Sequence, residues 1–175
     1  MNYQKNPESQ GMRLLNQIYL QGKTVFTHHE AVEMAKAEGI VLSQLNIILS
    51  SLVKSGSLSH IRRGLYALMG PWKVAEHPFI IAIRLVEPAA ISHWSALQHH
   101  GLTEQVPQVV MASTPKRVYT PSMRSGDSVQ KHGWEIQNIR YEYVQIKPEA
   151  FFGIEQIWLD ERSSIPMTDK ERTVL

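Results

Sequence analysis

The sequence of 175 residues contains no cysteine. Disulfide bonds, thiolate zinc sites, iron–sulfur clusters and cysteine nucleophiles are therefore excluded, and so is a small secreted fold held together by disulfides. Long apolar runs are missing as well, because the most apolar stretch, residues 79–91, contains Arg84, Glu87 and Pro88 and is too short to span a bilayer. Residues 1–7 are polar and contain no apolar signal-peptide segment. We therefore expect a cytoplasmic protein without a membrane partner.

Charged residues are sparse and unevenly distributed. They make up 19% of the chain, and the formal net charge is +2. Residues 1–75 contain eight Lys and Arg against four Asp and Glu, a net charge of +4, whereas residues 76–175 contain ten against twelve, a net charge of −2. A basic N-terminal half favours an anionic partner such as DNA, although ordinary surface variation explains a difference of this size equally well.

The apolar pattern of the first part of the chain predicts three helices. Residues 12–20 have the spacing of an amphipathic helix. Thr27 followed by Glu30 is a capping-box pattern that begins a second helix, which ends near Gly39. Ser43 is expected to cap a third helix, whose buried stripe consists of Leu45, Ile48, Leu49, Leu52 and Val53.

A hairpin is predicted after the third helix. Residues 58–61 and 65–68 alternate as strands do, and Arg62-Arg63-Gly64 between them forms the turn. Three helices followed by a hairpin predict a winged helix-turn-helix domain over residues 1–70, which the Gly-Pro pair of Met69-Gly70-Pro71-Trp72 separates from the rest.

Residues 71–175 predict a small α/β domain, so the chain as a whole is expected to be α+β. Residues 78–86 predict a short helix, and Pro88 is expected in the first turn of a second helix over residues 89–100. Strands are expected at residues 109–111, twice within 134–146, at 154–159 and at 165–167, with Thr168 or Asp169 capping a last helix. Residues 119–133 predict a loop, in which Arg124 and Lys131 are candidate nucleic-acid contacts.

A winged-helix domain inserts its third helix into the major groove of DNA. The outward face of that helix is expected to carry Gln44, Ile47, Ser51 and Lys54, flanked by Asn46 and Ser50. Asn and Gln side chains bond adenine, an apolar side chain meets the methyl group of thymine, and a lysine reaches phosphate. These residue types are also common on any solvent-exposed helix.

The turn of the hairpin gives a sharper signal. Arg62 and Arg63 are adjacent, with His60 close by, and two neighbouring arginines repel each other unless an anion lies between or beside them. We expect all three to contact DNA. Residues 23, 24, 28 and 29 offer further phosphate contacts, but helix capping by Thr27 explains that segment without DNA.

Catalytic patterns are weak, and we expect neither an enzyme nor a metal or cofactor site. Gly22-Lys23-Thr24 lacks the first glycine of a phosphate-binding loop, because that position is Gln17. His93 and His100 of the expected helix are ~10 Å apart and cannot share one zinc ion. Ser92 and Ser95 have no Gly-x-Ser-x-Gly elbow.

A metal-dependent nuclease is a weaker alternative. Gln145-Ile146-Lys147, with Asp127 upstream, imitates an acidic-x-Lys motif, but an amide is a poor substitute for the carboxylate that holds the metal ion.

Several segments resemble the AbiEi-type antitoxins, which are transcriptional regulators of abortive-infection (type IV) toxin–antitoxin systems. The matching segments are Arg62-Arg63-Gly64-Leu65-Tyr66-Ala67-Leu68, residues 88–97, His99-His100-Gly101-Leu102, Phe152-Gly153-Ile154-Glu155 and residues 169–175. Together they cover most of the chain from about residue 12 onward. Family members usually continue past the Glu171-Arg172-Thr173 motif, so we expect a domain shortened at its C-terminus.

The resemblance implies an autorepressor of a phage-defence operon. It implies that the N-terminal domain binds double-stranded DNA of its own promoter and that the C-terminal domain opposes a cognate nucleotidyltransferase-like toxin. Two-fold operators usually require a dimer, so a homodimer on DNA is expected, although coiled-coil heptads are missing from the sequence.

A second alternative is a protein-interaction module that neutralises the toxin without specific DNA binding. Its partner contacts are expected around His93, Trp94, Gln98 and His99, with burial of Trp94 in the core as the simpler interpretation.

Overall fold

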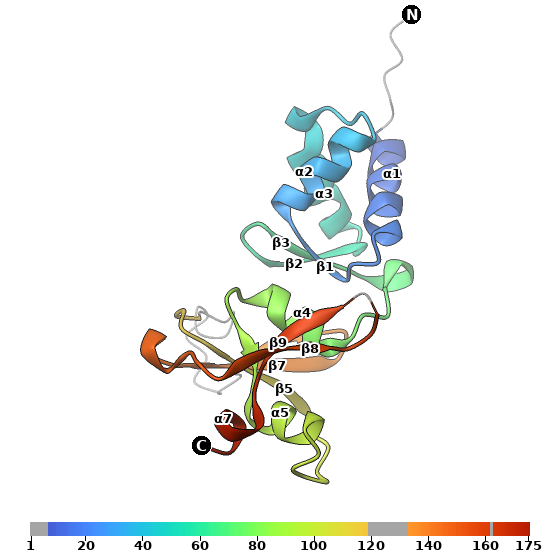
Figure 1. The fold of residues 1–175 in the computed structure, drawn as a ribbon. Coiled ribbons are helices and arrows are strands. Elements are labelled where there is room, and N and C mark those ends of the chain that lie inside the picture. The colour runs from blue at the N-terminus through green and yellow to red at the C-terminus, as the bar shows by residue number, and fades with distance from the viewer. Residues whose placement is uncertain (1–6, 119–132, 162) are drawn as a thin grey trace, which may run out of the picture. The chain divides into compact units, whose positions relative to one another are not determined.

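The computed structural model describes residues 7–118, 133–161 and 163–175 (Figure 1). The protein is a mixed α+β chain that forms two compact units, Met1–Glu76 and His77–Leu175. The division falls after the expected Gly-Pro break, because the segment that follows Pro71 is held in the first unit. The backbone N–H of Thr24 donates to the Glu76 carboxylate (2.7 Å), and the Thr24 hydroxyl donates to the Val74 carbonyl (3.1 Å).

The described part of the first unit combines three helices with a three-stranded antiparallel sheet. Its elements are α1 (Pro7–Leu20), β1 (Val25–Thr27), α2 (His28–Ala37), α3 (Leu42–Lys54), β2 (Leu58–Arg62), β3 (Leu65–Leu68) and the single turn η1 (Gly70–Trp72). The strand order is β1-β3-β2, so Tyr66 of β3 lies between Phe26 of β1 and His60 of β2. The three helices and the β2–β3 hairpin were predicted, whereas β1 is too short to show an alternating pattern.

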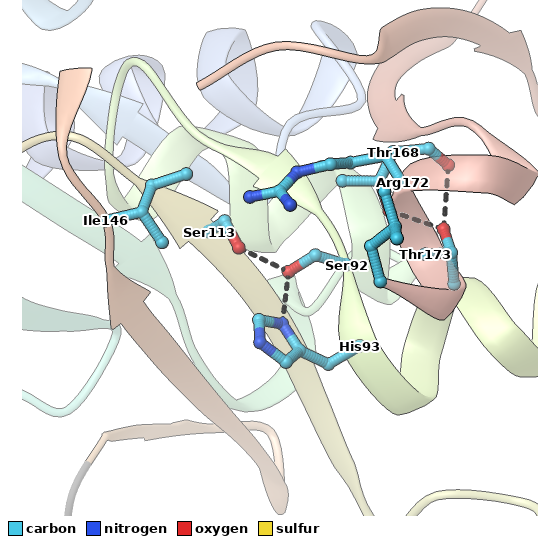
Figure 2. Close-up of a pocket in the computed structure, with 8 residues that line it drawn as sticks. Ser92, His93, Ser113, Ile146, Thr168, Arg172 and Thr173 are labelled. Carbon is cyan, nitrogen blue, oxygen red and sulfur yellow. Dashed lines mark hydrogen bonds between the residues drawn. The ribbon is translucent and has the colours of Figure 1, made fainter. Parts of the chain in front are cut away.

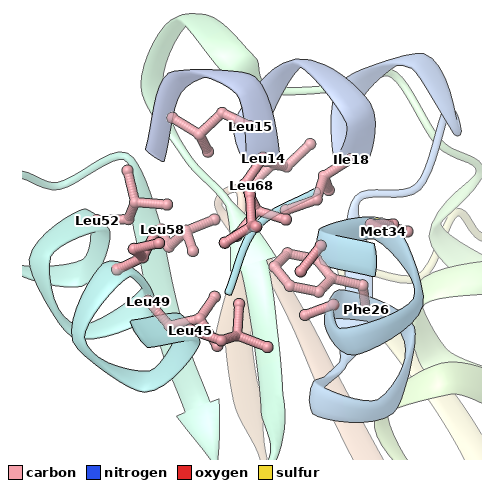
Figure 3. Close-up of a cluster of buried hydrophobic side chains, with 14 residues drawn as sticks. Leu14, Leu15, Ile18, Phe26, Met34, Leu45, Leu49, Leu52, Leu58 and Leu68 are labelled. Atoms are coloured by element: carbon pink, nitrogen blue, oxygen red, sulfur yellow. The ribbon is translucent and has the colours of Figure 1, made fainter. Parts of the chain in front are cut away.

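Apolar side chains from all three helices and from the sheet form the core of the first unit (Figure 3). Four of the five predicted stripe residues of α3 are buried, and Val53 is partly buried at the edge of the core. They pack with residues of the other elements, among them Leu14, Leu15, Ile18, Phe26, Met34, Leu58 and Leu68. Each buried side chain of this size stabilises the fold by roughly 1.5–3 kcal/mol.

One of the two predicted helix caps of the first unit is confirmed. The Thr27 hydroxyl accepts from the backbone N–H of Glu30 (3.2 Å), and the Glu30 carboxylate accepts from the backbone N–H of Thr27 (2.7 Å). The cap at Ser43 is wrong, because α3 begins at Leu42 and the N-cap position before it is Val41, whose side chain makes no capping hydrogen bond. Ile40 is buried in the core, so the turn closes there and Ser43 falls inside the first turn of the helix.

The described part of the second unit contains a six-stranded mixed sheet in the order β6-β7-β5-β4-β9-β8. The pairs β5–β7 and β4–β9 are parallel, and the other neighbouring pairs are antiparallel. The elements are α4 (Pro78–Leu85), β4 (Ala90–Ile91), α5 (His93–His99), β5 (Val109–Thr114), β6 (Trp134–Ile136), β7 (Ile139–Gln145), η2 (Pro148–Ala150), β8 (Ile154–Trp158), β9 (Ser164–Thr168) and α7 (Lys170–Val174).

The helix expected over residues 89–100 is wrong in its first part. Ala90 and Ile91 form the central strand β4, which pairs with β5 on one side and with β9 on the other, and α5 begins only at His93. Both β4 residues are fully buried, and such a short apolar run does not distinguish a strand from a helix. The cap at Asp169 is confirmed, since its carboxylate accepts from the backbone N–H of Arg172 (2.6 Å). Arg124, Asp127 and Lys131 lie outside the described residues.

Among the described residues, no single helix has the length and apolar character needed to cross a membrane. The helices α2 and α3 meet that criterion only as a pair, across a bend of 116°.

Replacement of Thr27 by alanine is expected to lower the free energy of unfolding by about 1 kcal/mol, because the N–H of Glu30 loses its acceptor. Urea unfolding of the full chain followed by circular dichroism measures this change. Thr27→Ser keeps the hydroxyl and is expected to lose much less, and equal losses in the two variants would contradict the capping role.

Glu30 is expected to stabilise the protein in a pH-dependent way. Burial alone raises the pKa of this carboxyl, but hydrogen bonds from Lys23 and from Thr27 outweigh burial and hold the pKa below its ordinary value. A lowered pKa in the folded state gives stability that is present above the pKa of the unfolded chain and is lost as the pH falls through the pKa of the folded state. The gap in unfolding free energy between the parent and Glu30→Gln should therefore shrink from pH 7 to pH 3. A gap that does not change with pH would contradict this coupling.

Candidate nucleic-acid interface

All eight residues that the sequence assigns to DNA binding are exposed on the first unit. They lie on α3, on β2 and in the turn between β2 and β3: Gln44, Asn46, Ile47, Ser51, Lys54, His60, Arg62 and Arg63.

The exposed face of α3 lies opposite its buried stripe. Gln44, Ile47, Ser51 and Lys54 follow one another at intervals of three and four residues, so their side chains share one side of the helix. Ile47 is 68% exposed, and Val41 and Leu42 at the start of the helix are 56% and 43% exposed. The face therefore presents apolar surface between polar hydrogen-bonding groups, the combination that recognises base edges and thymine methyl groups.

The turn after β2 brings two arginines to the surface. The pairing of β2 with β3 shifts in register between His60 and Arg62, and Gly64 adopts a φ of 73° that favours glycine. Among the described residues, no carboxylate forms an ion pair with Arg63. A bulged turn that ends in an uncompensated positive charge can donate hydrogen bonds to phosphate oxygens.

His28, the first residue of α2, connects the turn with α3. Its backbone N–H donates to the Gly64 carbonyl (2.8 Å), and its ring Nε2 lies 2.9 Å from Oδ1 of Asn46, so the ring N–H donates to that oxygen. Sequence reasoning attributed this segment to capping alone and missed the bridge. No spacing pattern indicates it, because the three residues come from distant parts of the chain.

The bridge changes the role expected of Asn46. A bidentate contact to adenine needs both the carbonyl oxygen and the NH₂ group of an amide. The oxygen of Asn46 already accepts one hydrogen bond from His28, which fixes the orientation of the amide and uses one of its two acceptor positions. Gln44 is then the better placed of the two amides for reading adenine.

His60 and Tyr66 attach the hairpin to the core through a row of ring contacts, in which Tyr66 stacks on Phe26 and His60 is tilted against Tyr66. The ring centroids of His60 and Tyr66 are 5.2 Å apart, and those of Tyr66 and Phe26 are 5.7 Å apart. Because Phe26 is fully buried, the row of rings restricts movement of the hairpin relative to the sheet.

The candidate partner-binding residues of the second unit lie on α5. Trp94 is 48% exposed, so the expectation that it belongs to the core is wrong, and Gln98 and His99 are exposed as well. Burial lowers the pKa of His99, and the nearby His100 lowers it further, while Glu155 opposes the change. The net effect favours the neutral form of His99.

The described residues bring together no group of three or more His, Cys, Asp or Glu that could hold a metal ion. Gln145 ends β7 and Lys147 precedes η2, while the third residue of the nuclease-like pattern, Asp127, lies outside the described residues.

Comparisons with known proteins include a structural likeness. No family model matches the chain, and no curated protein matches it. A crystal structure of the RV2827C protein from Mycobacterium tuberculosis is similar over 79% of this chain, with 12% sequence identity and a TM-score of 0.50. The likeness covers 46% of that protein, so this chain spans less than half of its length. At this identity the likeness concerns the mixed α+β fold alone.

Proposed function

We propose that the first unit is a winged helix-turn-helix domain that binds double-stranded DNA in a sequence-specific way. The helices α2 and α3 are joined by the short segment 38–41, which contains Gly39, and they differ in direction by 116°. Helix-turn-helix pairs join two helices at about 90–120° through a short turn that often contains glycine. The hairpin β2–β3 follows α3 directly, at the position of a wing.

The observation that carries the proposal is the bridge at His28. His28 forms hydrogen bonds both with Gly64 in the β2–β3 turn and with Asn46 on α3. The two candidate DNA-contacting segments therefore belong to one surface. When the face of α3 enters the major groove, the turn lies over an adjacent part of the sugar–phosphate backbone.

The exposed residues divide into three groups by their proposed contacts with DNA. Gln44 and Ile47 meet base edges, whereas Ser51 and Lys54 lie further along α3 and bind the phosphate backbone. Arg62, Arg63 and His60 bind phosphates or the minor groove at the wing. The net charge of +4 over residues 1–75 supplies the general attraction to DNA.

The resemblance to AbiEi-type antitoxins extends the proposal to regulation. On this basis the chain represses its own promoter, binds there as a homodimer, and opposes a nucleotidyltransferase-like toxin through its second unit. The half-exposed Trp94 favours a protein contact on α5, because a large aromatic side chain among polar neighbours is common at interfaces. Toxin binding without specific DNA binding is accordingly the second candidate function.

Fluorescence anisotropy with the full chain tests the main proposal. The probes are a duplex from upstream of the chain's own gene and a duplex of random sequence, each at two salt concentrations. We expect affinity at least about a hundredfold higher for the upstream duplex, a threshold set below the roughly thousandfold or larger difference that is typical of specific over non-specific binding. Equally weak binding to both duplexes that disappears with added salt would contradict the proposal and favour the second candidate.

Arg63→Ala is expected to weaken binding to both duplexes alike. The slope of log affinity against log salt concentration should fall in magnitude by about one, as the loss of one phosphate contact requires. Anisotropy titrations at several salt concentrations measure this slope. Lys36→Ala removes one positive charge from the exposed last turn of α2, and this control is expected to leave the slope nearly unchanged.

Gln44→Ala is expected to cost about 1–3 kcal/mol on the upstream duplex and almost nothing on random DNA. The same titrations measure both values, and Gln21→Ala, at an exposed glutamine after α1, is the matched control. Equal losses on the two duplexes would show that Gln44 does not read bases.

A further inference from the structure

A polar cavity of about 200 Å³ lies in the second unit, where segments far apart in the sequence meet (Figure 2). Ile91 of β4 pairs in parallel with Met167 of β9, so Ser92 and Thr168, the residues that follow them, emerge at the same edge of the sheet. Ser113 comes from β5 on the other side of β4. His93 begins α5, and Arg172 comes from α7. Sequence reasoning weighed Ser92 and His93 only as a catalytic pair and missed this arrangement.

Arg172 supplies a positive charge that the described residues do not neutralise. Its guanidinium lies over the ring of Phe152 at 4.8 Å and donates to the Ala150 carbonyl at 3.2 Å. Among the described residues, no carboxylate forms an ion pair with it, and the Asp169 carboxylate accepts from the backbone N–H of Arg172 instead. No acidic side chain lines the cavity. Figure 2 shows the guanidinium directed toward Ser113 and Ser92.

Three linked groups supply a further hydrogen-bond donor beside this charge. The Ser92 hydroxyl lies 2.7 Å from Nδ1 of His93 and 2.9 Å from the Ser113 hydroxyl, and both serines are buried. If protons point from Ser113 to Ser92 to His93, the ring keeps its N–H at Nε2 for a ligand. If they point the other way, the Ser113 hydroxyl keeps its proton for a ligand. In either direction one donor remains at an end of the chain.

The other two hydroxyl groups that line the cavity, those of Thr168 and Thr173, form hydrogen bonds within the protein. The hydroxyl oxygens of Thr168 and Thr173 are 2.7 Å apart, and the Thr173 hydroxyl donates to the Asp169 carbonyl (2.6 Å). Their protons are therefore used within the protein, and these residues hold α7 in place.

His93 occupies an unusual backbone conformation, with a φ of 54°. Residues other than glycine uncommonly adopt this left-handed region, asparagine, aspartate and histidine more often than the rest, and residues in such conformations gather at functional sites. Here the conformation accompanies a ring that contacts Ser92. Burial lowers the pKa of His93, and the charge of Arg172 lowers it further, so both favour the neutral form of the ring.

We propose that this cavity binds a phosphate group, either as inorganic phosphate or as the terminal group of a small phosphate monoester. A guanidinium donates two parallel hydrogen bonds to two phosphate oxygens. The Ser113–Ser92–His93 chain donates to a third oxygen, which a carboxylate does not have. The site lies in the second unit and does not depend on DNA binding by the first.

Nuclear magnetic resonance tests the proposal on the full chain. Inorganic phosphate, AMP and acetate are titrated separately, up to about 20 mM, a range that includes dissociation constants near 1 mM. We expect saturable shifts of backbone amide signals with phosphate or AMP, and much weaker effects of acetate. Tighter binding of AMP identifies the monoester, whereas equal binding identifies the free phosphate group as sufficient.

Variants separate the cavity from general charge attraction. Arg172→Met is expected to weaken phosphate binding at least tenfold, whereas Lys170→Met, which removes one exposed charge from the same helix, should change it less than twofold. His93→Asn removes the ring and keeps a residue type that tolerates the backbone conformation, and a loss of three- to tenfold is expected. A dispersed amide spectrum like that of the parent verifies folding of each variant.

Three results would overturn the proposal. One is equal phosphate binding by Arg172→Met and Lys170→Met, another is competition by acetate at equal concentration, and a third is shifts that never saturate. DNA affinity is measured on the same Arg172→Met protein and is expected to equal that of the parent. A loss as large as that of Arg63→Ala would instead assign Arg172 to the DNA-binding surface.

Discussion

Burial of one side of α3 is the constraint on which the first unit depends. Leu45, Ile48, Leu49 and Leu52 occupy the core between α1, α2 and the sheet, and rotation of the helix about its axis would expose all four. At roughly 1.5–3 kcal/mol for each side chain, such a rotation would cost about as much as the whole fold is worth. The direction in which Gln44, Ile47, Ser51 and Lys54 point is therefore set by the core, before any ligand is considered.

A surface that reads DNA also needs a fixed distance between its parts, and here polar contacts provide it. The hairpin is held along its strands by the Phe26–Tyr66–His60 rings and at its turn by the backbone hydrogen bond from His28 to Gly64. His28 then extends the connection to Asn46 on α3. In the proposed complex Asn46 contributes mainly as a positioning residue, because the hydrogen bond from His28 fixes the orientation of its amide.

Features that depend on neighbouring residues could be predicted from the sequence, and features that depend on distant ones could not. The capping box at Thr27, the stripe of α3 and the cap at Asp169 are each visible within one or two helical turns. By contrast, β1 and β4 exist only because other strands pair with them, and Ala90-Ile91 looks helical without those partners. The same reason hides the His28 bridge and the cavity beside Arg172, whose residues meet only in the folded chain.

The short helix α7 shows why a positive charge can remain in the cavity. Five residues are too few to form a stable helix alone, so α7 is held by the Asp169 cap, by the Thr168–Thr173 hydroxyls and by the contacts of Arg172 with Ala150 and Phe152. These contacts fix the Arg172 guanidinium and prevent it from turning toward solvent. A fixed, partly desolvated cation raises the free energy of the unliganded protein unless an anion approaches it. The fold orders this charge before any ligand binds. In the proposed phosphate complex, binding therefore does not have to offset the entropy lost in fixing the Arg172 side chain.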